Sequence, residues 1–335
     1  MATRQADSPL PCGEFELIDR FFAPLARSLP GSFNLKDDVA ALATKPGHEL
    51  VLKTDSTIES VHFLADDPPN AVGQKALRRA LSDLAAKGAE AHAYLLALAL
   101  PPKISLAWLE EFTEGLSADQ AQFGIALAGG ETSRTPGALT ITVTAIGWVR
   151  EGRLLRRSGA KPGDEVWVTG TIGDAAGGLC LLKKEAALQN KTARDRLVRR
   201  FRLPEPRLQS GIALGGIASA GIDISDGLIA DLGHIALVSN AKIEIALDRV
   251  PISPELRALW GNSPETVLRA ISAGDDYEIA FTAPADAADD IAAAAGRTLT
   301  MATRIGRVIR GAGDVALLDA AGRGISAKRK GYTHF

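Results

Sequence analysis

Apolar residues recur along the chain in two spacings, one typical of helices and one typical of strands. The clearest helix is predicted from about Ala71 to Lys87, where Asn70 can cap the start and Gly88 can end the helix in a left-handed turn. We expect the buried face of this helix to consist of five apolar side chains: Leu77, Ala80, Leu81, Leu84 and Ala85. One carboxylate, Asp83, lies at the border of that face and calls for an explanation.

The same reasoning predicts the other elements. Helices are expected at 14–25, 105–123, 175–188, 207–219 and 228–239, followed by two short helices and an alanine-rich helix. Strands are expected at 49–55, 91–100, 125–128, 139–149, 165–169, 222–224, 243–247 and 277–282, with two weak strands near the end. The charged stretch that leads up to Arg202 is assigned no element. Since strands and helices alternate in both halves, each half is predicted to be α/β or α+β.

A polar stretch rich in glycine and arginine, residues 150–163, separates the two halves. Such composition is typical of a domain boundary, and 335 residues are many for a single hydrophobic core. We therefore expect an N-terminal domain over residues 1–150 and a C-terminal domain over 151–335.

Charge and cysteine content narrow the class of function. The net charge is −2 and no basic block occurs, which argues against nucleic acid or an anionic membrane surface as the main partner. The two cysteines, Cys12 and Cys180, stand far apart, so neither a disulfide framework nor a metal-thiolate site is expected. No signal-peptide core and no stretch of ~20 apolar residues occurs, and we expect a cytoplasmic protein without a membrane span.

Carboxylates recur beside apolar segments, which suggests a shared ionic site. They are Asp37, Asp38, Asp55, Asp83, Glu131, Asp223, Asp226, Asp275 and Asp276. Clustered carboxylates with few histidines favour Mg²⁺, which takes oxygen ligands and commonly bridges proteins to phosphates. The alternative for Asp83 is a pair of surface contacts with Arg79 and Lys87, four residues to either side.

Other candidate chemistry is less specific. Glycines at 129–130 and 170–178 could bring backbone N–H groups close to a phosphate, or could serve as ordinary turns. His62 could reach the same cleft as Asp55 or could be a turn residue. The common nucleotide-binding glycine motifs are absent, and no arrangement of serine or cysteine with histidine supports covalent catalysis.

Longer blocks of sequence are more distinctive. They are GEFELIDRFF from Gly13, KDDVAAL from Lys36, KTDSTIESVHF from Lys53, QKALRRALSDLAAKGA from Gln74, GGETSRTPG from Gly129, RRSGAKPGDEVWVTGTIGDAAGGL from Arg156, IDISDGLIADLGHI from Ile222, AGDDYEIAFT from Ala273 and KGYTHF from Lys330. In these blocks and their order, the chain resembles the thiamine-monophosphate kinase family, a branch of the aminoimidazole-ribonucleotide synthetase superfamily. The resemblance implies a two-domain architecture with mixed sheets and helices, an N-terminal domain for ATP and metal binding and for dimerisation, and a C-terminal domain that completes the ATP and substrate site. It also implies a homodimer.

The resemblance further implies an activity and a set of site residues. The activity is ATP-dependent phosphorylation of thiamine monophosphate to thiamine diphosphate, assisted by several Mg²⁺ ions. Metal roles fall on Asp38, Lys53, Thr54, Asp55, Asp83, Glu131, Asp223 and Asp226; ATP contacts fall on Gly130, Glu131, Arg157 and Ser225; substrate contacts fall on His62, Asp275 and Tyr332. Asp83, Arg157 and Asp226 are the residues implied in catalysis.

Some positions depart from the family pattern. Lys36 replaces a glycine, Lys53 a serine or threonine, Ala80 an asparagine, Glu131 an aspartate and Asp275 a glutamate. For Lys53 we expect that only its backbone faces the site; the alternatives are an ammonium that stands in for a metal ion or one that pairs with Asp55 or Asp38.

These departures keep two further functions open. One is another ATP-dependent enzyme of the superfamily. The other is a ligand-binding relative that has kept the cleft and lost turnover.

Overall fold

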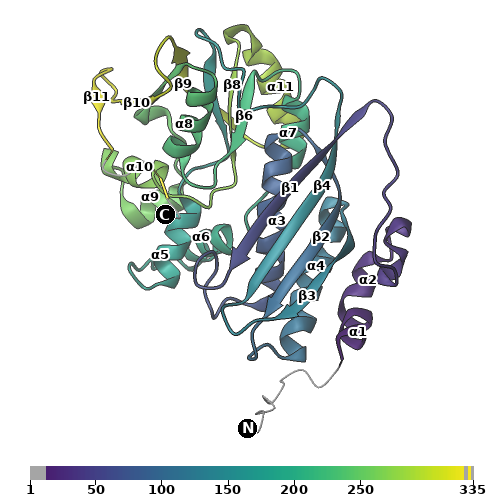
Figure 1. Ribbon diagram of the computed structural model, residues 1–335. Coiled ribbons are helices and arrows are strands. Elements are labelled where there is room, and N and C mark those ends of the chain that lie inside the picture. Colours follow the sequence, from purple (N-terminus) through teal and green to yellow (C-terminus); the bar gives the residue numbers. More distant parts are fainter. Residues whose placement is uncertain (1–12, 328–330, 333–335) are drawn as a thin grey trace. The chain divides into compact units, whose positions relative to one another are not determined.

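The computed structural model describes residues 13–327, 331 and 332 (Figure 1), so the N-terminal tail and Cys12 lie outside the described residues. The chain divides into two compact units. The N-terminal unit comprises Met1–Ala80 and Ala91–Trp148, and the C-terminal unit comprises Leu81–Glu90 and Val149–Phe335. The division near residue 150 matches the expected boundary, but Leu81–Glu90 groups with the second unit. No described helix is both long enough and apolar enough to cross a membrane.

The N-terminal unit is built on a four-stranded sheet with strand order β1-β4-β2-β3. Its elements are α1 (Glu14–Leu17), a π-helical turn (Ile18–Phe22), α2 (Ala23–Ala26), a 3-10 segment (Pro30–Leu35), β1 (His48–Ile58), α3 (Pro69–Ala86), β2 (Glu90–Leu100), α4 (Leu106–Phe123), β3 (Ala126–Arg134) and β4 (Thr140–Arg150). Strands β2 and β3 are parallel. The expected strand at 125–128 is therefore longer than predicted, because it continues through the glycine pair.

Helix α3 confirms the strongest sequence pattern. The five residues of the predicted apolar face are each 0% exposed, and Gly88 follows the helix in a left-handed conformation. The expected cap is wrong by two residues, because the helix begins at Pro69, and the Asn70 side chain accepts a hydrogen bond from the N–H of Ala71 within the first turn. Proline suits the first turn of a helix, where its missing N–H has no intrahelical partner.

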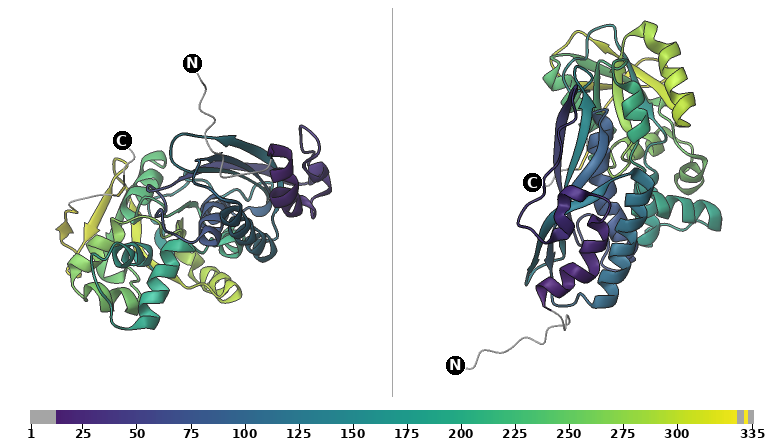
Figure 2. Two further views of the ribbon diagram at one scale, coloured as in Figure 1. Left: turned by 90° about the horizontal axis from the view of Figure 1, so that it is seen from below. Right: turned by 90° about the vertical axis from the view of Figure 1, so that its right-hand side faces the viewer.

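The two faces of this sheet differ. Helices α3 and α4 lie on one face (Figures 1 and 2). Exposed side chains of β1 lie on the opposite face. Along β1 the exposed positions alternate, and Leu50, Leu52, Thr54 and Ser56 share the open face. A strand places successive side chains on opposite faces, so Lys53, Asp55 and Thr57 point the other way.

The C-terminal unit is built on a seven-stranded mixed sheet with strand order β11-β10-β7-β9-β5-β8-β6. Its strands are β5 (Glu165–Thr169), β6 (Ala220–Asp223), β7 (Lys242–Ala246), β8 (Ile279–Ala283), β9 (Ala302–Ile309), β10 (Val315–Leu318) and β11 (Gly324–Ile325). Its helices are α5 (Asp174–Leu182), α6 (Lys191–Arg202), α7 (Leu208–Leu214), α8 (Leu228–Val238), α9 (Pro254–Trp260), α10 (Pro264–Ile271) and α11 (Ala288–Thr298). Most pairings are antiparallel, and β10 with β7 is parallel.

Helix α8 packs against this sheet, and its buried residues Leu228, Leu232 and Ile235 join one continuous apolar core. Two expected helices end early, α5 at Leu182 and α7 at Leu214. The charged stretch before Arg202 was left unassigned and is helix α6, where the Asn190 side chain caps the first turn through the N–H of Ala193. Except for the buried Arg200, its charged side chains are exposed or partly exposed, and only a narrow stripe of the helix is buried, which explains why the helix was missed.

Candidate active site

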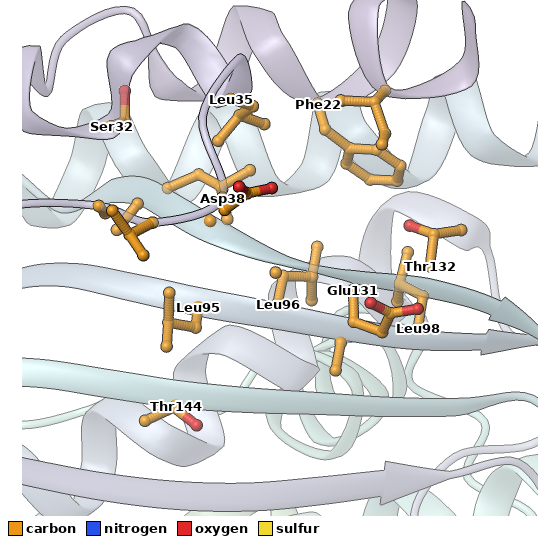
Figure 3. Close-up of a pocket in the computed structure, with 18 of the residues that line it drawn as sticks. Phe22, Ser32, Leu35, Asp38, Leu95, Leu96, Leu98, Glu131, Thr132 and Thr144 are labelled. Carbon is orange, nitrogen blue, oxygen red and sulfur yellow. The ribbon is translucent and has the colours of Figure 1, made fainter. Parts of the chain in front are cut away.

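A pocket of about 780 Å³ lies within the N-terminal unit, between the first helical segment and the sheet. Its acidic lining residues are Glu14, Asp37, Asp38 and Glu131. Figure 3 shows Asp38, from the loop before β1, and Glu131, from β3, beside the same space. Asp38 and Glu131 therefore line one pocket, and their role as ligands of a shared ion stays a prediction.

The two glycine segments each have a structural role in the fold. A side chain at Gly130 would meet the carbonyl oxygen of Leu96 at 1.9 Å, so glycine is needed there for strand pairing. In the second segment, the N–H groups of Gly170, Ile172 and Gly173 donate to Met301, Pro251 and the Asp276 carboxylate, respectively. Those three N–H groups are already used within the protein, and a phosphate contact by 170–178 stays a prediction for the rest of the segment.

Strand β1 separates the predicted metal ligands Thr54 and Asp55. The hydroxyl of Thr54 is 2.9 Å from that of Thr144 on the open face, whereas Asp55 lies on the opposite face. There the ammonium nitrogen of Lys53 is 3.6 Å from a carboxylate oxygen of Asp55. The side chain of Lys53 thus lies on the face opposite to Thr54, as the period of a strand predicts, and the expectation that only the Lys53 backbone faces the site stays a prediction.

His62 occupies the turn that follows β1. Its ring Nδ1 accepts a hydrogen bond from the backbone N–H of Ile58 at 3.0 Å. The backbone N–H of His62 donates to the Ile58 carbonyl at 2.9 Å. The ring therefore helps to hold the turn, and a substrate contact would have to use Nε2.

In the C-terminal unit, the loop after β6 is held by one carboxylate. Oδ2 of Asp231 accepts hydrogen bonds from the N–H groups of Ser225, Asp226 and Gly227, at 3.0, 3.1 and 3.1 Å. Burial, followed by the nearby charges of Asp223 and Asp226, raises the pKa of Asp231 to about 8. The carboxylates are thus crowded into a space where negative charge is poorly solvated.

Asp83 lies in the last part of α3, which belongs to the same unit. The neighbouring Ser82 donates a 2.9 Å hydrogen bond to the buried carboxylate of Asp223. Of the two suggested surface partners of Asp83, Lys87 donates to the carbonyl of Gly221 and Arg79 donates to the carbonyl of Ser56. The structure thus gives both cations other acceptors, and it brings the Asp83 segment against β6.

The two predicted substrate residues of this unit are fastened to the same loop. The N–H of Asp275 donates to the carbonyl of Ser225, and the N–H of Tyr332 donates to that of Asp226, each at 2.9 Å. Tyr332 is 53% exposed, so its ring is accessible to a ligand. Arg157 is exposed, and its carbonyl accepts a hydrogen bond from Ser239.

The predicted site residues therefore form two groups, one in each unit. Asp38, Gly130 and Glu131 line the pocket of the N-terminal unit, together with residues that the sequence did not suggest, such as Thr144. The second group comprises Asp223, Ser225 and Asp226 with the chain segments that carry Asp83, Asp275 and Tyr332.

Sequence reasoning missed Asp231, which organises the second group. The sequence does offer an indication of this role. Asp231 lies in the first turn of α8, shortly after the Ser225–Gly227 turn. A carboxylate at that position can accept hydrogen bonds from the free N–H groups at a helix start. His234 was also missed, although one ligand atom each from Asp226, Asp231 and His234 lies within 4.8 Å of the others.

Comparison with known proteins decides the family. The family models described as AIR synthase related protein, N-terminal domain and C-terminal domain, match residues 36–149 and 161–319. The thiamine-monophosphate kinase of Caulobacter vibrioides is 39% identical over 332 residues, covering 98% of this chain and 93% of that protein. The chain belongs to the thiamine-monophosphate kinase family.

Solved structures agree with that family. The thiamine-monophosphate kinase of Stenotrophomonas maltophilia K279a is 40% identical, with a TM-score of 0.79, and the match covers 87% of this chain and 91% of that one. The structure of AaThiL complexed with AMPPCP and TMP is 32% identical, with a TM-score of 0.77, and covers 96% and 97%. The predicted resemblance and the predicted two-domain α/β architecture are confirmed.

Proposed function

We propose that this chain transfers the γ-phosphoryl group of ATP to thiamine monophosphate and so makes thiamine diphosphate. The observation that carries the proposal is the match, over nearly the whole of both chains, to a family member solved with AMPPCP and TMP. AMPPCP is an ATP analogue, so that complex holds a donor analogue together with the acceptor. Two thiamine-monophosphate kinases, each 39% identical to this chain over nearly its full length, support the same activity. ATP as the donor is consistent with the cytoplasmic location expected from the sequence.

The donor atoms of both groups suit Mg²⁺. They are carboxylate oxygens in the pocket and in the crowded cluster around Asp226 and Asp231, and Cys180 is buried elsewhere in the C-terminal unit. The residues that would hold the ions are Asp38, Thr54, Asp55, Asp83, Glu131, Asp223 and Asp226, as the family resemblance implies. When bound, Mg²⁺ would offset the mutual repulsion of the two phosphate-bearing substrates.

The remaining chemistry needs no nucleophilic side chain. The acceptor phosphate already carries an anionic oxygen, so the protein has to bind and orient the substrates rather than remove a proton. Arg157 supplies a fixed positive charge toward ATP. Gly130 and Ser225 contribute contacts with ATP, while His62, Asp275 and Tyr332 contact thiamine monophosphate. Asp83 and Asp226 are the carboxylates on which turnover depends.

An open apolar sheet face supports a homodimer. Leu50, Leu52 and Leu95 of the N-terminal unit are 50%, 61% and 38% exposed. Exposed leucines on one side of a sheet are typical of a surface that a second protein covers. In a two-fold dimer the same face of each copy covers that of the other, so both apolar faces are buried together. Analytical ultracentrifugation that found only monomer at assay concentrations would contradict this part of the proposal.

Acceptor choice tests the proposed reaction. We expect kcat/KM for thiamine monophosphate to exceed that for unphosphorylated thiamine by about 10²-fold, because an alcohol lacks the acceptor phosphate and needs a base to deprotonate it. The measurement is ADP release in a coupled assay with each acceptor. Comparable rates with both would contradict the mechanism. Binding of thiamine monophosphate without any ADP release would favour the ligand-binding alternative.

The Lys53 ion pair predicts a change in metal dependence. Both side chains are partly exposed, so the pair is worth ~0.2–1 kcal/mol. Lys53→Thr frees the Asp55 carboxylate, and the Mg²⁺ concentration for half-maximal rate should fall by about 2-fold. A Mg²⁺ titration of kcat measures this, with the exposed Lys183→Thr as the matched control. An unchanged midpoint in Lys53→Thr would show that the ion pair does not compete with the metal.

A further inference from the structure

The segment Gly274–Glu278 adopts an unusual backbone. Asp275 and Tyr277 have φ angles of +68° and +53°, a left-handed region that favours glycine. Such a conformation costs ~1 kcal/mol or more for each residue and persists only where neighbouring groups hold it. The residues that hold this segment also set the position of Asp275, one of the proposed substrate contacts.

Backbone contacts hold the segment to the Ser225 loop on one side. The N–H groups of Asp275 and Tyr277 donate to the carbonyls of Ser225 and Ile224, at 2.9 and 2.8 Å. A side chain at Gly274 would lie 2.2 Å from the Ser225 carbonyl oxygen, so only glycine permits this approach. The path of the backbone is thus fixed against the loop proposed to contact ATP.

Buried polar contacts hold the segment from the other side. The Asp276 carboxylate accepts the N–H of Gly173 at 2.9 Å, and Arg200 donates both to the Asp276 carbonyl, at 3.1 Å, and to the Glu278 carboxylate, at 2.9 Å. Asp276 and Glu278 are 1% and 0% exposed. These contacts fix residues 276 and 278, and they leave the direction of the Asp275 side chain undetermined.

The hydroxyl of Tyr277 provides that direction. It donates a 2.9 Å hydrogen bond to Oδ1 of Asp275, while the Tyr277 side chain is 2% exposed and cannot swing away. A hydrogen bond from a rigid, buried donor fixes the rotamer of an acceptor that is itself only half-buried.

We propose that Tyr277 is a positioning residue that sets the Asp275 carboxylate for the thiamine moiety of the acceptor. The inference rests on the proposed function, in which Asp275 contacts thiamine monophosphate. Tyr277 acts through Asp275 and touches neither substrate. The left-handed φ of both residues serves this contact, because it turns the Tyr277 hydroxyl back toward the residue two positions earlier.

Tyr277→Phe removes only the hydroxyl and tests the role directly. We expect the KM for thiamine monophosphate to rise about 10-fold, the usual scale for losing one hydrogen bond to a charged group, while kcat and the KM for ATP stay within about 2-fold. Tyr94→Phe is the matched control: Tyr94 is equally buried, in the N-terminal unit, and its hydroxyl accepts a hydrogen bond from Gln120. That variant should lose stability without changing either KM.

A double-mutant cycle separates positioning from general loosening. Asp275→Gly removes the carboxylate and suits the +68° φ. In that background Tyr277→Phe should have no further effect on KM. An unchanged KM for thiamine monophosphate in Tyr277→Phe, or a full effect that survives in the Asp275→Gly background, would overturn the proposal. A parent chain that turns over no thiamine monophosphate would contradict the proposed function as well, whereas an active parent with an unaffected variant contradicts only the positioning role.

Discussion

Asp83→Asn is expected to lower kcat about 10³-fold or more while leaving the unfolding temperature within ~2 °C of the parent. Asparagine keeps the size and shape of the side chain, so α3 and its packing are unchanged. It removes the negative charge, and an amide is a poor substitute for a carboxylate that is proposed to bind Mg²⁺ beside two phosphate-bearing substrates. Steady-state kinetics at saturating Mg²⁺ and a thermal unfolding curve measure the two effects separately.

Asp66→Asn makes the same chemical change at an exposed position of the loop before α3 and serves as the control. It should leave kcat unaltered. If Asp83→Asn retained more than about a tenth of the parental kcat, the surface-pairing interpretation of Asp83 would be preferred, since a surface ion pair contributes little to catalysis.

Glu278→Gln is expected to lower the free energy of unfolding by about 3 kcal/mol. The Glu278 carboxylate is fully buried and accepts hydrogen bonds from Arg200, Arg207 and the hydroxyl of Thr169. A neutral amide leaves the two guanidinium groups without their buried counter-charge, and an amide N–H₂ cannot accept what a carboxylate oxygen accepted. Chemical denaturation with urea at neutral pH gives the difference in stability.

The pH dependence of that difference has a defined sign. Burial alone would raise the pKa of Glu278, but Arg207 and Arg200 more than offset it and hold the pKa below its ordinary value. A depressed pKa contributes stability above the unfolded value of ~4.3, and this contribution is lost as the pH falls through the folded value. The parent and Glu278→Gln should therefore converge in stability as the pH falls below about 4.

Glu205→Gln is the matched control for the network. Glu205 lies 3.1 Å from Arg207, which also donates to Glu278 at 2.7 Å, but the Glu205 side chain is 45% exposed. Its replacement should cost less than ~1 kcal/mol, because solvent screens the pair. Equal losses in Glu205→Gln and Glu278→Gln would show that burial does not set the strength of these interactions.

Local patterns predicted the elements well where the apolar spacing was strong. The face of α3 was correct at every position, and so was the alternation of strands and helices in each half. Element ends were less accurate. Helix α7 ends at Leu214 and β1 extends to Ile58. The ends of helices and strands depend on contacts with other parts of the fold rather than on the spacing of apolar residues. Helix α6 was missed for a related reason: most of its face is solvated, so its stability comes from packing against α5.

The sequence suggested candidate site residues, but it indicated little of how they are arranged in space. Asp38 and Glu131 do share a pocket, as the clustering of carboxylates suggested. The period of a strand placed Lys53 and Asp55 on one face, but it gave no information on which face the site would use. The residues that hold the site residues in place, Asp231 and Tyr277, lie within the quoted sequence blocks, but the blocks alone did not indicate their hydrogen-bond partners.

The sequence by itself determined the family, the two α/β halves and the identity of the carboxylates, because periodicity and motif blocks are local properties of the chain. The tertiary structure decided which segments that carry those carboxylates are neighbours. Ser82, next to Asp83, donates a hydrogen bond to Asp223 across 141 positions of sequence, and the Asp275 segment lies against the Ser225 loop. It also decided how the second glycine segment is held, since the N–H groups of Gly170, Ile172 and Gly173 find acceptors at Met301, Pro251 and Asp276. Such contacts join residues far apart in the chain, and only the packing of complete elements brings their donors and acceptors within hydrogen-bonding distance.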